Sequence, residues 1–268
     1  MNSPATLFGI AALLYGASFA AAFASFLKRG EGGGFWFFAL AFAGFVAHTS
    51  ALGVVAARCG RLPVYNSYEL LEAIAWMIVA VDLSAAAVLR VKILGSLTAL
   101  AACALTALPL MCPVFSEKVC AAEPTAGDLA AVHAAVAIVA YSFIALSSFF
   151  GCMYVLQRRS LKTRANDAFS RALLPLPRLV RFARRSLGAA CLAMAASAGL
   201  GIAAAAGSDP SPVMWAKFAA GFFLFAAMLA LLAFSSRLSE LAFSRLCVAM
   251  FALAIFLLIP IQLRTVFL

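Results

Sequence analysis

The chain has 268 residues, of which 66% are hydrophobic and only 11% are charged. A soluble domain carries about 45–50% apolar and about 25% charged residues, so this composition, with a mean hydropathy of +1.05, excludes a soluble globular protein and indicates an integral membrane protein. The net charge of +10 is concentrated in short connections between apolar segments, which indicates membrane orientation rather than nucleic-acid binding.

The apolar segments predict an all-α, polytopic membrane protein with eight transmembrane helices in a single domain, residues 1–268. Each segment approaches or exceeds the roughly 20 residues that cross about 30 Å of hydrocarbon. In chain order the predicted spans are Pro4 to Leu27, Phe35 to Ala57, Tyr68 to Leu89, Ile93 to Phe115, Leu129 to Leu156, Ser186 to Ala206, Pro212 to Phe234 and Ala242 to Leu263. Pro109 and Pro113 are expected to bend or end the fourth span.

Lysines and arginines are unevenly divided between alternate connections. One set, which includes a basic loop at residues 157–186, carries about 15 bases and the other about five. Because cytoplasmic loops are enriched in bases, we expect the first set to be cytoplasmic and both termini to lie outside a bacterial inner membrane. The basic loop places Leu176, Leu179, Val180 and Phe182 among arginines in roughly helical spacing, which fits either a short surface helix on anionic lipid or a solvated loop.

Seven cysteines are present, without a CxxC motif or metal-ligand spacing. Cys59 and Cys120 fall in connections predicted to face outward, where a disulfide between them can form. Most of the others lie in apolar segments, as expected of packing residues.

His48 and His133 are the only histidines, and both are flanked by apolar sequence. An ionisable group in a bilayer is costly and is therefore a functional candidate, and neutral imidazole is a ligand of haem iron. The alternative for each is a hydrogen bond to a neighbouring helix. We expect His48 near the middle of the membrane and His133 about 6 Å below its outer surface, at about 1.5 Å per residue.

Three acidic residues fall in the third predicted span. Glu69 and Glu72 are three residues apart, hence on one helix face. Arg58 and Arg61 are near enough to pair with these carboxylates or with haem propionates. Asp82 lies deeper and must be neutral, hydrated or paired with Arg90 or Lys92.

The segment after His48 contains an ordered series of residues: Gly60, Arg61, Pro63, Asn66, Tyr68 and Glu69. This series resembles the cytochrome c assembly family of membrane proteins, the CcsA and HemX-like branch. There, a membrane histidine precedes a Gly-(Arg/His)-x-Pro-x-x-Asn-x-Tyr-Glu element. A second match begins at His133, which Tyr141 follows in a helix of small residues.

The family's haem-handling members have a tryptophan-rich segment with a Trp-Asp-Pro core that cradles haem on the outer face. The corresponding segment here keeps Asp209, Pro210 and Trp215, but Ser208 stands where a tryptophan is expected. The family's later histidines are absent. This chain therefore offers one ligand to each of two haem sites, or both ligands to one.

The resemblance implies a haem-handling accessory protein of cytochrome c biogenesis, which holds or passes haem b near the outer leaflet together with a partner membrane subunit. His133 is the expected exposed iron ligand and His48 the buried one. The other expected cofactor-binding residues are Trp215, Asp209, Arg61, Tyr68 and Glu69. Two alternatives stay open: a structural or regulatory subunit without haem, and a transporter that uses Glu69, Glu72 and Asp82.

Overall fold

The computed structural model describes residues 3–29, 35–64, 66–89, 94–111, 128–163, 174–206 and 212–267. Within these ranges the secondary structure is helical throughout. The helices are α1 (Pro4–Arg29), α2 (Phe35–Cys59), α3 (Ser67–Leu89), α4 (Leu94–Met111), α5 (Asp128–Lys162), α7 (Leu176–Ala205), α8 (Pro212–Ala233) and α9 (Glu240–Phe267), with a 3-10 turn η2 (Phe234–Ser236) between the last two.

Six of the described helices, α1, α2, α5, α7, α8 and α9, are long and apolar enough to cross a membrane. The chain therefore has the character of a multi-pass membrane protein. The remaining two are less clear spans, because the apolar part of α4 is shorter and α3 carries Glu69, Glu72 and Asp82. Eight crossings stay a prediction.

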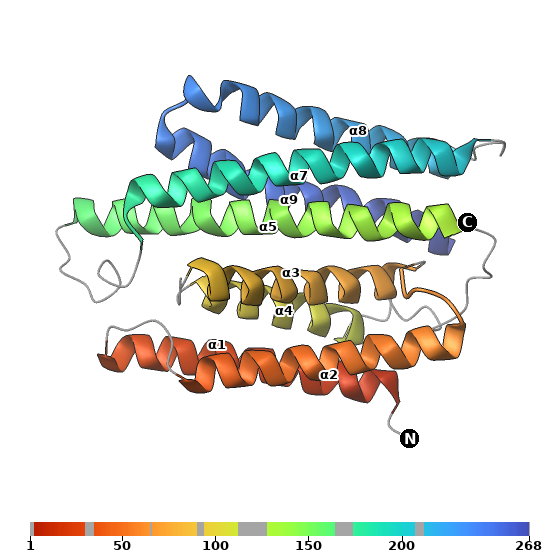
Figure 1. Ribbon diagram of the computed structural model, residues 1–268, viewed down its shortest axis with the longest axis horizontal. Helices are drawn as coiled ribbons and strands as arrows, with labels where there is room; N and C mark the ends of the chain where they lie inside the picture. The colour runs from red at the N-terminus through yellow and green to blue at the C-terminus, as the bar shows by residue number, and fades with distance from the viewer. Residues whose placement is uncertain are drawn as a thin grey trace.

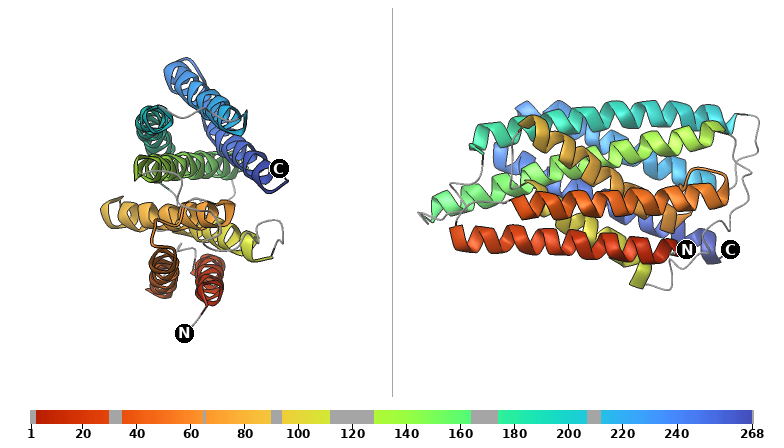
Figure 2. Two further views of the ribbon diagram at one scale, coloured as in Figure 1. Left: turned by 90° about the vertical axis from the view of Figure 1, so that its right-hand side faces the viewer. Right: turned by 60° about the horizontal axis from the view of Figure 1, so that its bottom comes forward.

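The helices run alternately in opposite directions in a layered bundle (Figure 1). Seen along their length, α1 and α2 form one layer, α3 and α4 the next, and α5, α7, α8 and α9 the remainder (Figure 2). The start of α1 and the end of α9 lie at one end of the bundle, called here the terminal end. The end of α5, the start of α7 and the α8–α9 turn lie at the opposite end, called here the basic end.

Packing divides the chain into two halves. In the N-terminal half, α1 packs against α2 and α4, and α3 against α4. In the C-terminal half, α5 packs along α7 and α9, and α8 covers α7 and α9. The two halves meet mainly where α3 packs against α5. The largest apolar cluster extends from α3 through α5 to α7, α8 and α9.

Prolines and one asparagine define several helix starts. Pro4 and Pro212 are the first residues of α1 and α8, where the missing N–H has no helical partner to lose. Asn66 precedes α3 and accepts a hydrogen bond from the backbone N–H of Glu69 at 2.7 Å, as an N-cap residue does. Pro109 lies inside α4, whose described residues run to Met111, and Pro113 lies outside the described residues.

The described parts of the expected basic loop at residues 157–186 are mostly helical instead. The 35-residue helix α5 continues to Lys162, and α7 begins at Leu176. The predicted surface helix is the first two turns of α7, where Leu179 and Val180 are buried in the C-terminal core. At about 1.5 Å per residue α5 is about 52 Å long, so its basic end extends beyond about 30 Å of hydrocarbon.

Candidate functional site

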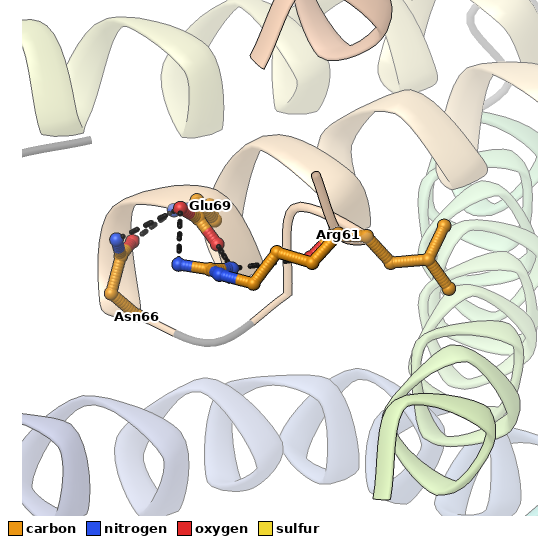
Figure 3. Close-up of polar contacts among 4 residues, drawn as sticks. Arg61, Asn66 and Glu69 are labelled. Atoms are coloured by element: carbon orange, nitrogen blue, oxygen red, sulfur yellow. Dashed lines mark hydrogen bonds and ion pairs between the residues drawn. The ribbon is translucent and has the colours of Figure 1, made fainter. Parts of the chain in front are cut away.

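The segment from Gly60 to Glu69 folds around an ion pair between the end of α2 and the start of α3 (Figure 3). Gly60 adopts a φ of 63°, a left-handed conformation that glycine reaches without a Cβ clash. The Arg61 guanidinium donates to both Glu69 carboxylate oxygens, at 2.8 and 3.3 Å, and the two side chains are 7% and 1% exposed. Asn66 Nδ2 donates to Glu69 Oε1 at 3.1 Å.

Three residues of the sequence motif thus form a polar cluster. Arg61 and Glu69 satisfy one another, as one of the two sequence alternatives expected, and Asn66 both caps α3 and binds the Glu69 side chain. The cluster fixes how the chain enters α3.

His48 is completely buried in α2, between α1 and α3. Its Nδ1 lies 3.4 Å from the Tyr15 hydroxyl of α1, and its Nε2 lies 3.3 Å from Glu72 Oε2 of α3. The Phe8 ring packs edge-on against the imidazole, with 5.4 Å between centroids. Both ring nitrogens of His48 therefore face side chains of neighbouring helices.

Glu72 is also completely buried. Thr106 of α4 lies beside its carboxyl group, but no contact meets hydrogen-bond geometry: both Glu72 oxygens, Thr106 Oγ1 and His48 Nε2 are buried without a hydrogen-bond partner. Among the described residues, His48 is the basic side chain within ion-pair distance of Glu72.

Asp82 forms a second buried acidic position on α3. Thr98 of α4 donates to its Oδ2 at 2.8 Å, while Oδ1 is buried without a partner. Ten residues separate Asp82 from Glu72, about 15 Å along the helix, and the apolar Val79 and Ala102 are buried nearby in the same half. Arg90 and Lys92, the partners considered from sequence, lie outside the described residues.

His133 lies in the second turn of α5 and contacts α7. Its Nδ1 is 2.6 Å from the Ser197 carbonyl oxygen and 3.1 Å from the Ser197 hydroxyl. Because a carbonyl only accepts, this contact assigns the ring proton to Nδ1 and leaves the lone pair on Nε2. The ring also lies against Gly201, where a Cβ would approach Nδ1 and Cε1 to 2.9 Å.

The two histidines differ in how well they suit haem iron. Metal-binding histidines usually donate their second ring N–H to a carbonyl or carboxylate, and His133 does so while its side chain stays partly exposed. His48 offers no such nitrogen, since Tyr15 and Glu72 lie at either side of its ring and no part of it is exposed. The surroundings of His133 suit a ligand of haem iron, whereas those of His48 do not suit a second iron ligand.

The other predicted site residues divide between the two halves. Tyr68 is buried beside Phe8, with 5.7 Å between ring centroids, and so lies near His48. Trp215 is 61% exposed in the first turn of α8. Asp209 lies outside the described residues. The expected site is therefore not one cluster: His48, Tyr68, Arg61 and Glu69 belong to the N-terminal half, and His133 and Trp215 to the C-terminal half.

Cys59 is disulfide-bonded, as one sequence expectation allowed; Cys120, its expected partner, lies outside the described residues. Cys103, Cys152, Cys191 and Cys247 are free. Among the residues that the structure describes, no group of three or more His, Cys, Asp or Glu side chains is arranged to hold a metal ion.

Sequence reasoning did not identify the residues of other helices that contact the histidines or Glu72. These residues belong to no sequence motif and lie in apolar helices; they are Tyr15, Thr106, Ser197 and Gly201. Spacing offered a weak signal: Ser197 and Gly201 are four residues apart, and Thr98 and Thr106 eight apart, so each pair shares a helix face.

No known protein-family model matches this chain, and a search of curated proteins finds no match.

Proposed function

We propose that this membrane protein binds haem through His133 and holds or passes it at the terminal end of the bundle, as an accessory protein of cytochrome c biogenesis. The observation that supports the proposal is the contact between His133 Nδ1 and the Ser197 carbonyl. It orients the imidazole and leaves Nε2 as the coordinating atom.

Three features of α5 and α7 support His133 as the haem ligand. The Ser197 hydroxyl donates to the His133 carbonyl at 3.2 Å, which ties the second turn of α5 to α7. Gly201 leaves room for the ring. The side chain is partly exposed, so a planar ligand can approach its edge.

His133 Nε2 would hold the haem iron, and a donor from outside this chain would complete its ligation. Trp215 and Asp209 stay proposed contacts for the porphyrin. The N-terminal half holds Arg61, Tyr68, Glu69 and His48. We do not include these residues in the proposed haem site. A partner membrane subunit of the assembly machinery is the proposed source of the second ligand, and the terminal end is proposed to face outward from a bacterial inner membrane.

One observation favours a second candidate, a structural or regulatory subunit without haem. Both histidines contact neighbouring helices, His48 through Tyr15 and His133 through Ser197, as expected of residues that join helices in a bundle. A transporter is less well supported, because Glu72 and Asp82 are about 15 Å apart along α3 with buried apolar side chains nearby.

Absorption spectroscopy of the purified protein, with and without added haem, tests the proposal. We expect a Soret band that is lost in His133→Ala and retained in His48→Ala. In Gly201→Ala the new Cβ displaces the ring, so haem affinity should fall by about 10- to 100-fold, as for other changes that disturb a ligand's orientation. The matched control is Gly199→Ala on the same helix, where a Cβ meets nothing within 4 Å.

Absence of a Soret band after haem addition to folded wild-type protein would favour the subunit without haem. A band that survives His133→Ala at full strength would show that haem binds elsewhere.

A further inference from the structure

The His48–Glu72 pair is a buried polar site that the proposed haem function does not use. The two side chains are 0% exposed, and 3.3 Å separates Nε2 from Oε2. They come from α2 and α3, whose residues 48 and 72 are brought together by packing within the N-terminal half.

Every helix of this half contributes to the surroundings of the pair. Tyr15 of α1 contacts His48 Nδ1, and Phe8 covers the ring. On α3 the phenol of Tyr68 lies near the Glu72 carboxyl, and on α4 Thr106 lies beside it. The nearby base on the chain, Arg61, is paired with Glu69, and no cationic side chain of the described residues pairs with Glu72.

Charge balance limits the protonation states that this site can hold. A carboxylate beside a neutral imidazole would leave one uncompensated negative charge in an apolar bundle, which is costly without a partner. One additional proton makes the pair neutral, whether it resides on the carboxyl or on the imidazole. It also places a hydrogen between Nε2 and Oε2, which lie 3.3 Å apart.

We propose that Glu72 and His48 form a buried proton-binding site in which the two side chains share one proton and carry no net charge. In this arrangement the Glu72 carboxylic acid donates to His48 Nε2, and His48 Nδ1–H donates to the Tyr15 hydroxyl oxygen. Binding adds one proton to the Glu72 oxygen, and release returns that proton to water and leaves a carboxylate.

A proton fits this site better than a metal cation does. One Glu72 carboxyl oxygen lies 3.3 Å from an imidazole nitrogen, whereas hard cations such as Na⁺ and Ca²⁺ favour several oxygen ligands. The hydroxyl groups near the carboxyl belong to Thr106 and Tyr68, and the described part of the chain contains no three-residue metal cluster.

Infrared spectroscopy of the full-length protein in lipid, at neutral pH, tests the proposal. A protonated carboxyl group gives a C=O stretching band that a carboxylate lacks and that shifts in D₂O. We expect Glu72→Gln to remove one such band. The matched control is Glu69→Gln, three residues earlier on α3, where the replaced carboxylate is ion-paired with Arg61; it should leave that band unchanged. Asp82→Asn should leave it unchanged as well.

His48→Ala distinguishes a shared proton from an isolated carboxylic acid. Loss of the imidazole acceptor should shift the Glu72 band to higher frequency. An unchanged band in His48→Ala, or an unchanged spectrum in folded Glu72→Gln, would overturn the proposal. A band that depends on Na⁺ concentration would overturn it in favour of a cation site.

Isotope labelling keeps the test valid if Glu72→Gln fails to fold. Carboxyl-¹³C glutamate in wild-type protein should move the band, and carboxyl-¹³C aspartate should not. Movement with labelled aspartate alone would assign the band to an aspartate such as Asp82 and contradict the proposal. Neither result depends on haem binding at His133, so this proposal and the proposed function can fail separately.

Discussion

Neighbouring acids on α3 have different partners although they occupy one helix face. Glu69 is bound by Arg61 and Asn66, whereas Glu72, one turn deeper, faces His48. A local motif encodes the first set of contacts, since all three residues lie within nine positions. The second contact joins residues 24 positions apart, and the sequence gives no spacing rule for such a pair. The ion pair was therefore one of the predicted alternatives, and the histidine–glutamate pair was not predicted.

Replacing Arg61 should be the most damaging single change in the Gly60–Glu69 segment. Arg61→Ala leaves the buried Glu69 carboxylate without its cation, and breaking a buried pair in this way costs about 3–5 kcal/mol. Thermal unfolding in detergent should show a large decrease in midpoint. Arg58→Ala is the control, because Arg58 is exposed and surface changes usually stay within about 0.5 kcal/mol.

Adding Glu69→Gln to Arg61→Ala should recover part of the lost stability, because it removes the unpaired charge. Equal unfolding midpoints for Arg61→Ala and Arg58→Ala would show that the ion pair contributes little.

At the scale of whole helices, apolar segments located the elements well but underestimated the length of several of them, including α5, α7 and α9. The starts of α1, α2 and α8 agree with the predicted spans, because apolar sequence and proline mark them. α5 and α7 extend further at the basic end. The exposed residues at this end include Arg158, Arg159, Arg178 and Arg181. Helical structure therefore continues beyond the apolar sequence, and the length of the apolar segment underestimates the length of the helix.

The contact between α5 and α9 depends on Gly151. A Cβ at this position would lie 2.6 Å from the Ser244 carbonyl oxygen, and backbone cannot rotate away as a side chain can. Gly151→Ala should therefore separate α5 from α9 and lower the unfolding free energy by about 1–3 kcal/mol, the usual cost of overpacking.

Gly188→Ala on α7 provides the control for this contact, since a Cβ there meets nothing within 4 Å. It should be neutral or stabilising by up to about 1 kcal/mol, because alanine has the higher helix propensity. A Gly151→Ala protein as stable as the Gly188→Ala protein would show that the two helices adjust freely.

At the scale of the whole molecule, charge is distributed unequally between the two ends. The described bases at the basic end include Arg158, Arg159, Lys162, Arg178, Arg181, Arg184, Arg185, Arg237 and Arg245. Those at the terminal end include Arg58, Arg61 and Lys217. Enrichment of bases on the cytoplasmic side predicts that the terminal end faces outward.

Enzyme fusions test this orientation and the number of crossings together. Alkaline phosphatase, which is active only outside the cytoplasm, should be active when fused after Leu268 and inactive when fused after Thr163. The opposite pattern would reverse the orientation. Activity at both positions would mean that the helices before residue 163 and those after it do not cross as predicted.

The N-terminal and C-terminal halves of the bundle share few contacts, which has a consequence for biosynthesis. Helices α1 to α4 make most of their contacts with one another, and all of them precede α5 in the chain. Once α4 has left the ribosome, all the described residues around His48 and Glu72 have been synthesised and released. The first four helices can assemble before α5 is inserted, and α3 then presents the surface on which the later helices dock.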